Sequence, residues 1–262
     1  MKKILTLIFA ALLLTACSQK KEKILVLYYS QSNTTKALAE EIQLQLQCDI
    51  DEIECTNPYT GDFNSVLTRW QNELQSGKKP ELNPLNKNIS DYDVIFLGYP
   101  VWGGTYALPI ASLLEKTNFA GKKVVPFCTF GSGGLNTSSA ELKKNAKNAQ
   151  ILNGYGIRQA RISNAKEEVS KFLIKAGFKQ GEAEVLPEFS AQKEVTDAEK
   201  EIFHQACDGY QFPLGNPVTV GSRATKEGTE YLFTVEVQDG KTAQIFVIKK
   251  DNSKAEFTEV VR

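Results

Sequence analysis

Between Lys23 and about Gly177 the sequence alternates between short apolar runs and longer stretches with helical periodicity. Apolar runs of this length are typical of strands that are buried on both faces, as in parallel sheets. The pattern predicts strands at residues 24–29, 49–54, 94–99, 123–130 and 150–158. It predicts helices at residues 34–46, 63–76, 109–116, 138–148 and 164–176. Five strand–helix units in succession favour an α/β fold, a doubly wound five-stranded parallel sheet with strand order 2-1-3-4-5.

The pattern changes after residue 178, which we take as the end of a first domain at residues 23–178. Residues 179–193 are polar and are predicted to be a linker. Thr196 and Glu199 have the spacing of a capping box, which predicts a helix that runs to about Cys207. Strand-like stretches separated by turn signals follow at residues 217–225, 230–238, 241–249 and 255–261. Residues 194–262 should therefore form a small α+β domain, a helix with an antiparallel meander.

The first 16 residues carry two lysines and an apolar segment that is too short to span a membrane, which is typical of a secretory signal peptide. The four residues Leu-Thr-Ala-Cys that end at Cys17 resemble the lipobox of bacterial lipoproteins. This resemblance implies cleavage before Cys17, lipidation of Cys17 and a tether at residues 17–22. Ser18 would favour the outer membrane in a Gram-negative host. The alternative is an ordinary signal peptide with a chance cysteine.

Charge and cysteine usage exclude several classes of protein. The chain has 31 basic and 31 acidic residues, so nothing indicates nucleic-acid binding. Removal of the signal peptide takes away two lysines and leaves 29 basic residues, a net charge of about −2. The single histidine, His204, excludes a His-rich metal site. The cysteines after the lipobox are predicted to be buried or partly buried free thiols; they are Cys48, Cys55, Cys128 and Cys207.

Polar or aromatic segments follow three of the predicted strands. They are SQSNTT at residues 30–35, PVWGG at residues 100–104 and TFGSGG at residues 129–134. In the strand order 2-1-3-4-5 these three strands are neighbours, and ligands of doubly wound sheets bind beyond the carboxyl ends of the strands. We therefore expect the three loops to form one site.

The first loop opens a helix, where unpaired backbone N–H groups and the helix dipole favour an anion. Hydroxyl or amide side chains surround it, from Ser30, Ser32, Asn33, Thr34 and Thr35, without a lysine or arginine inside the loop. Such neutral donors suit a phosphate. The loop resembles that of flavodoxin, T/S-x-T-G-x-T, with Asn33 in the glycine position, where a positive φ is needed. The alternative is a plain N-capping turn.

The second loop places Trp102 beside Gly103, and an indole in such a loop can stack on a planar heterocycle. The sequence Pro100-Val101-Trp102-Gly103 resembles the P-x-W-x-G loop of flavodoxin-like domains. Many of those domains have a second tryptophan where this chain has Gly103. Tyr59 or Tyr106 would then have to supply the second stacking surface.

The third loop is similar to the glycine-rich loop that closes over the flavin edge in the flavodoxin family. The resemblance assigns this role to Thr129, Phe130, Gly131, Ser132 and Gly133, whose backbone amides would bind the pyrimidine carbonyls. A serine-hydrolase role for Ser132 is disfavoured because the loop lacks the G-x-S-x-G pattern and the domain has no histidine.

The resemblance extends over the whole first domain and implies noncovalently bound FMN and electron transfer, with the redox chemistry supplied by the cofactor. The electron partner would be a redox protein or a quinone. One alternative is an FMN-dependent NAD(P)H:quinone or nitro reductase. Another is a docking lipoprotein that keeps the fold without the cofactor.

Overall fold

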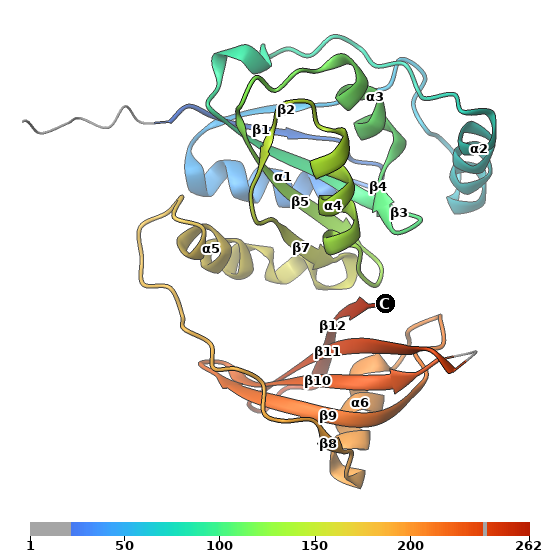
Figure 1. Cartoon of the computed structure of the whole chain (residues 1–262), viewed down its shortest axis with the longest axis vertical. Helices are drawn as coiled ribbons and strands as arrows, with labels where there is room; N and C mark the ends of the chain where they lie inside the picture. The colour runs from blue at the N-terminus through green and yellow to red at the C-terminus, as the bar shows by residue number, and fades with distance from the viewer. Residues whose placement is uncertain (1–21, 238–239) are drawn as a thin grey trace, which may run out of the picture.

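The computed structural model describes residues 22–237 and 240–262, so the predicted signal peptide and Cys17 lie outside the described residues. The chain forms two units that are stacked along the long axis of the molecule (Figure 1). The first unit is a parallel sheet with helices on both faces, and the second is an antiparallel sheet with one helix. The predicted fold class is confirmed for both units.

The first sheet has the strand order β2-β1-β3-β5-β6, which matches the predicted order. Its strands are β1 (Ile24–Tyr28), β2 (Asp49–Glu52), β3 (Val94–Trp102), β5 (Lys123–Phe130), β6 (Gln150–Ile151) and β7 (Tyr155–Arg158). A two-residue strand, β4 (Thr105–Tyr106), pairs antiparallel with the end of β3. In the centre of the sheet, Val26 pairs with Phe96 and Phe96 pairs with Val125.

Two helical layers bury this sheet. The helices are α1 (Thr34–Leu46), α2 (Phe63–Ser76), α3 (Leu108–Lys116), α4 (Leu135–Asn145) and α5 (Ala165–Lys175). Helices α1 and α5 cover one face, where Leu38 and Val169 pack in the same cluster as Phe96 (Figure 1). Helices α3 and α4 cover the other face, where Leu113 and Leu142 pack in one cluster with strand residues. Helix α2 has no fully buried residue and lies at the edge of the unit (Figure 1).

The predicted strand at residues 150–158 is wrong in one respect, because the structure divides it into β6 and β7. Pro126 of β5 explains the gap. Leu152 donates its N–H to the carbonyl of Val124. The backbone N–H and carbonyl groups of every second residue of β5 therefore point toward β6 and β7, and Pro126 is one of these residues. A proline has no N–H to offer there, and the ladder is interrupted. Gly154 fits against this point because a Cβ would lie 2.4 Å from the carbonyl oxygen of Pro126.

The segment from Pro100 to Trp102, predicted as a loop, is also strand, since β3 continues through it and turns back into β4. Gly103 and Gly104 form the turn, with φ of 58° and 89°. Positive φ at both central residues is typical of a tight two-residue hairpin turn, and Gly-Gly is one of its sequence signals.

The second unit is built as predicted around a helix and a meander. Helix α6 (Asp197–Cys207) begins after Thr196, and the capping box with Glu199 is confirmed. The strands are β9 (Asn216–Thr225), β10 (Gly228–Glu236), β11 (Thr242–Lys250) and β12 (Ala255–Val261). A two-residue strand that was not predicted, β8 (Lys193–Glu194), pairs with β9. Phe203 of α6 packs on Phe233 with ring centroids 5.2 Å apart and closes the core of this unit.

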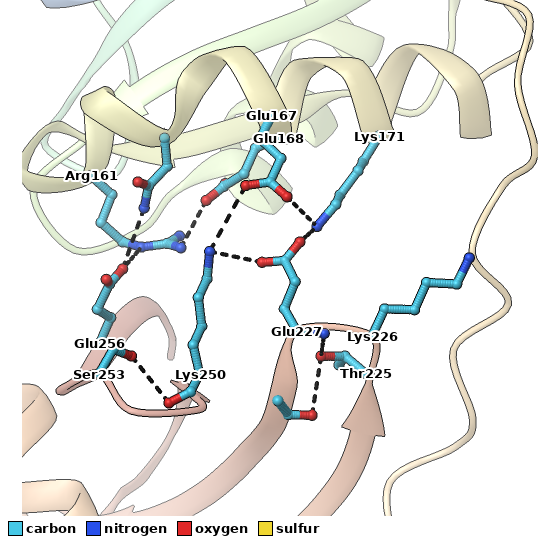
Figure 2. Close-up of polar contacts among 12 residues, drawn as sticks. Arg161, Glu167, Glu168, Lys171, Thr225, Lys226, Glu227, Lys250, Ser253 and Glu256 are labelled. Atoms are coloured by element: carbon cyan, nitrogen blue, oxygen red, sulfur yellow. Dashed lines mark hydrogen bonds and ion pairs between the residues drawn. The ribbon is translucent and has the colours of Figure 1, made fainter.

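Ion pairs join the two units (Figure 2). Arg161, which precedes α5 and has only 10% of its side chain exposed, contacts Glu256 of β12 at 2.9 Å. Glu227, in the turn between β9 and β10, contacts Lys171 of α5. It also contacts Lys250 at 2.7 Å. The second unit is therefore held against α5 by charged side chains.

The cysteines of the described residues are all free, as predicted. Cys55 and Cys128 are buried, and Cys48 and Cys207 are half-buried. Within residues 22–237 and 240–262, no helix has the length and apolar character needed to cross a bilayer. The same residues contain no cluster of His, Cys, Asp and Glu side chains that could hold a metal ion.

One buried hydrogen bond connects the start of α1 to the end of β5. The hydroxyls of Thr35 and Thr129 lie 2.7 Å apart, and the two residues are only 1% and 4% exposed. Because the partners come from segments 94 residues apart, this bond brings the first and third predicted loops together.

Replacing Thr35 by valine should leave the buried Thr129 hydroxyl without this partner and lower the free energy of unfolding by about 1–3 kcal/mol. Thr129→Val should have a similar effect. The double variant should lose much less than the sum of the two, because no polar group is then left unpaired. Urea unfolding followed by circular dichroism measures all three variants, and strictly additive losses would show that the two hydroxyls do not interact.

Candidate functional site

The three predicted loops lie at the carboxyl edge of β1, β3 and β5, which are neighbours in the sheet. Of the predicted site residues, Thr35 and Thr129 turn inward toward each other. Phe130 is also buried. The side chains of Thr35 and Thr129 therefore hold the first and third loops together.

The first loop offers unpaired backbone donors. Asn33 has φ 63°, the left-handed conformation that its glycine-like position requires, and it caps α1 without a side-chain hydrogen bond. Within the described residues, no acceptor receives the N–H groups of Asn33, Thr34 and Thr35. Three donors at the positive end of a helix dipole favour an anion.

The side chains of this loop are engaged with one another. Ser30 Oγ accepts the N–H of Lys36 at 3.2 Å. The hydroxyls of Ser32 and Thr34 lie 3.3 Å apart. The ammonium of Lys36 lies 3.3 Å from Glu52, which offsets its charge. The donors that remain for a ligand are mainly neutral.

Trp102 lies in an aromatic cluster beside this loop. Its ring meets Tyr59 edge-on at 5.0 Å and Tyr29 at 5.9 Å between centroids. Tyr59 is buried, its hydroxyl donates to Glu73, and the guanidinium of Arg69 lies over its ring at 3.9 Å. Burial, with Glu73 next, raises the pKa of Tyr59. Tyr59 thus supports Trp102 from the side.

Tyr106, the other residue expected to offer a stacking surface, is buried like Tyr59. It is 7% exposed, lies in the core beside Tyr99 and accepts a hydrogen bond from Asn145. Strand β4 pairs with the end of β3, and Tyr106 belongs to the same core cluster as Leu113 of α3 and Leu142 of α4.

Sequence reasoning missed Trp70 of α2. A Cβ on Gly103 would lie 2.6 Å from the Trp70 ring, so this indole packs directly against the turn after Trp102. The chain has Gly103 where many flavodoxin-like domains have a second tryptophan, and the ring of Trp70 comes to that turn from another element. No local signal links two residues so far apart in the sequence.

The third loop shows an asymmetry between its carbonyl and N–H groups. The carbonyl of Gly131 accepts from Arg158 Nε at 2.9 Å, and the carbonyl of Ser132 accepts from the N–H of Val260 at 2.7 Å. The N–H groups of residues 131–134 have no acceptor in the part of the chain that the structure describes. This loop can therefore donate to a ligand that carries acceptor atoms.

A cavity of about 520 Å³ lies between the turn after β3 and the third loop. Val101, Gly103 and Gly104 line it on one side, whereas Trp102 does not. The second unit lines the other side with Tyr210, Phe212 and residues 259–262. Burial raises the pKa of the Glu259 carboxyl in this lining.

The tyrosine and cysteine groups near the three loops hold their protons more tightly than usual. Burial raises the pKa of Tyr29 and of Cys55, the latter to about 11. Burial also raises the pKa of Cys128 well above its usual value. His204 is exposed and lies on α6 of the second unit. The arrangement is suited to binding and orienting a ligand through neutral donors and aromatic rings.

Comparison with known proteins identifies two family models in the chain. The flavodoxin model matches residues 23–175. The model for the prokaryotic membrane lipoprotein lipid attachment site matches residues 1–18 and supports a lipid-anchored location in the envelope. A comparison with curated protein sequences finds no significant match.

Similar solved structures come from several bacteria. A protein from Bacteroides uniformis ATCC 8492, described as a flavoprotein, is 28% identical with a TM-score of 0.50, and the match covers 58% of this chain and 99% of that one. A similarly described protein from Bacteroides eggerthii DSM 20697 is 30% identical, with a TM-score of 0.47 and coverage of 57% and 98%. A flavoprotein from Lactobacillus acidophilus NCFM, solved in complex with FMN, is 26% identical, with a TM-score of 0.47 and coverage of 55% and 97%. The chain, through residues 23–175, belongs to the flavodoxin family.

Proposed function

We propose that the chain binds FMN noncovalently at the loop edge of its first unit and transfers electrons at the membrane surface. The chain belongs to the flavodoxin family, and one observation in its structure carries this proposal. The first and third loops both have unpaired backbone N–H groups, and the Thr35–Thr129 hydrogen bond holds these loops together. The two sets of donors match a ligand that has a phosphate at one end and ring carbonyls at the other.

The first loop would hold the phosphate. The free N–H groups of Asn33, Thr34 and Thr35 point out of the N-terminus of α1, and the exposed Ser32 hydroxyl lies beside them. Neutral donors at a helix N-terminus bind phosphate without a lysine. The hydroxyl of Ser30 keeps its proton available, since in its bond to Lys36 it acts as the acceptor.

The second and third loops would hold the ring. Trp102 offers an indole, and the N–H groups of residues 131–134 are available for the ring carbonyls. The turn at Gly103 and Gly104 has positive φ at both residues, so its peptide can reorient and direct the Gly103 carbonyl toward an N–H of the ring. The cofactor supplies the redox chemistry when bound, and these residues orient it and exclude water.

Titration of the chain from residue 18 to 262 with FMN tests this proposal. The visible bands of FMN should shift on binding, and Trp102→Ala should weaken the affinity about tenfold through loss of ring contact. Leu44→Ala, at a residue that is 66% exposed on α1, is the control and should bind as the unaltered chain does. Unshifted bands for the unaltered chain at micromolar FMN would contradict the proposal.

The anchor is the second part of the proposal. The lipid attachment match at residues 1–18 includes Cys17, whose lipidation would hold the flavodoxin unit at a membrane. Ser18 next to Cys17 supports the outer membrane as the destination if the host is Gram-negative. Electrons would then be exchanged in the cell envelope.

Replacing Cys17 by alanine should move the protein from the membrane fraction to the soluble fraction, because the acylated sulfur is lost. Cys207→Ala is the matched control and should leave the protein in the membrane fraction, since Cys207 is a free thiol on α6. Immunoblots of fractionated cells give the measurement. Membrane retention of the Cys17 variant would show that another element anchors the chain.

A further inference from the structure

We propose that the second unit completes the flavin site, with β12 holding the third loop in its donating conformation and Phe212 forming an outer aromatic wall. This inference rests on the proposed function of the first unit. It assigns a ligand-binding role to residues 210–262, which lie outside the part of the chain that matches the flavodoxin family.

The cavity beside the third loop is shared by the two units. Its lining from the first unit consists of Val101, Gly103, Gly104, Phe130 to Gly134, Asn136 and Thr137. Its lining from the second unit consists of Tyr210, Phe212 and the last four residues of the chain. Without the second unit, the third loop would face solvent on this side.

Strand β12 contacts the third loop through the backbone. Val260 donates its N–H to the carbonyl of Ser132 at 2.7 Å. Gly133 lies so close that a Cβ there would be 2.3 Å from the carbonyl oxygen of Val260. Only a glycine at this position lets the strand approach the loop to this distance.

Arg158 forms a second bridge between the units. Its Nε donates to the carbonyl of Gly131, and its guanidinium donates to the carbonyl of Phe257 in β12, both at 2.9 Å. The guanidinium also lies over the ring of Phe257, at 4.0 Å from the centroid. These contacts tie one strand of the first unit, the loop and β12 together.

Because peptide groups are planar, the contacts that hold the carbonyls of the third loop also set the direction of its N–H groups. In a planar trans peptide the carbonyl of one residue and the N–H of the next point in opposite directions. The Gly131 carbonyl faces Arg158, so the Ser132 N–H points away from that guanidinium, and the Ser132 carbonyl faces Val260, so the Gly133 N–H points away from β12. The second unit thereby fixes the direction of the Gly133 N–H directly, and that of the Ser132 N–H through the bond between Arg158 and the Phe257 carbonyl. Neither donor has an acceptor in the described residues.

Phe212 supplies an aromatic surface at the same place. It lines the cavity, and 63% of the residue is exposed. Tyr210 meets it at 5.8 Å and itself packs on Phe257 at 5.2 Å between centroids. The pair therefore connects the cavity wall to the core of the second unit.

Ion pairs also hold the second unit against the first. Ion pairs between α5 and the β9–β10 turn hold one part of the interface, as Figure 2 shows. The Arg161–Glu256 pair holds β12 itself. The position of β12 is therefore held by contacts besides those that it makes with the third loop.

Two variants of the full chain test the inference. Val260→Pro removes the N–H that Ser132 accepts, and it should spare the ladder with β11 because this N–H points away from that strand. We expect about tenfold weaker FMN binding, the loss expected of about one hydrogen bond. We also expect a more negative midpoint potential, because the released donors no longer stabilise negative charge on the reduced ring.

Phe212→Ala is the second variant. Because the Phe212 side chain is largely exposed, its loss should leave the fold intact. It should weaken FMN binding roughly three- to tenfold through loss of an aromatic contact. Phe63→Ala is the matched control, since Phe63 is 77% exposed and lines none of the cavities described above. Its affinity and potential should equal those of the unaltered chain.

The outcomes separate this inference from the proposed function. FMN binding by the unaltered chain, with weaker binding in both variants and a shifted potential in Val260→Pro, supports the inference. Affinities and potentials equal to those of Phe63→Ala overturn it and leave the proposed function standing. Failure of the unaltered chain to bind FMN overturns both. Thermal unfolding of each variant confirms that the affinities refer to folded protein.

Discussion

The burial of β1, β3 and β5 between two helical layers is the constraint on which the rest of the structure depends. Strands buried on both faces run parallel, so their carboxyl ends meet at one edge and bring together loops that are distant in sequence. The Thr35–Thr129 hydrogen bond then locks the first loop to the third. Two predicted ligand-facing hydroxyls are used for this purpose, and the donors left for a ligand belong mainly to the backbone.

The candidate site is defined by an imbalance between donors and acceptors. At the first loop, the N-terminus of α1 leaves three N–H groups unpaired. At the third loop, Arg158 and Val260 occupy the carbonyls and leave the N–H groups free. These two neighbouring sets of donors can bind a ligand rich in acceptors. Backbone donors also cost little ordering entropy when a ligand binds, because the fold already holds them in place.

The second unit packs against the third loop of the first. Without the second unit, the glycine-rich third loop would be exposed on this side. Here β12 supports it, Arg158 bridges it and the Tyr210–Phe212 pair walls the adjacent cavity. These second-unit residues cover one side of the cavity. The other side is formed by the turn at Gly103, against which Trp70 packs. A lipid anchor at Cys17 and a docked second unit would together restrict which partners reach the loop edge.

The sequence by itself determined the fold class, the strand order and most of the elements, because burial imposes periodicities that can be recognised locally. Helices α1 and α2 and the capping box at Thr196 lie where the sequence predicts them, and the positive φ of Asn33 matches its glycine-like position. Even the departures carry local signals, such as Pro126 in β5 and the Gly-Gly turn after Trp102. Only the tertiary structure decided that Thr35 points at Thr129, that Trp70 packs on Gly103 and that Val260 holds the third loop. These contacts join residues that are distant in the chain, and their formation depends on how whole elements pack, which no local pattern encodes.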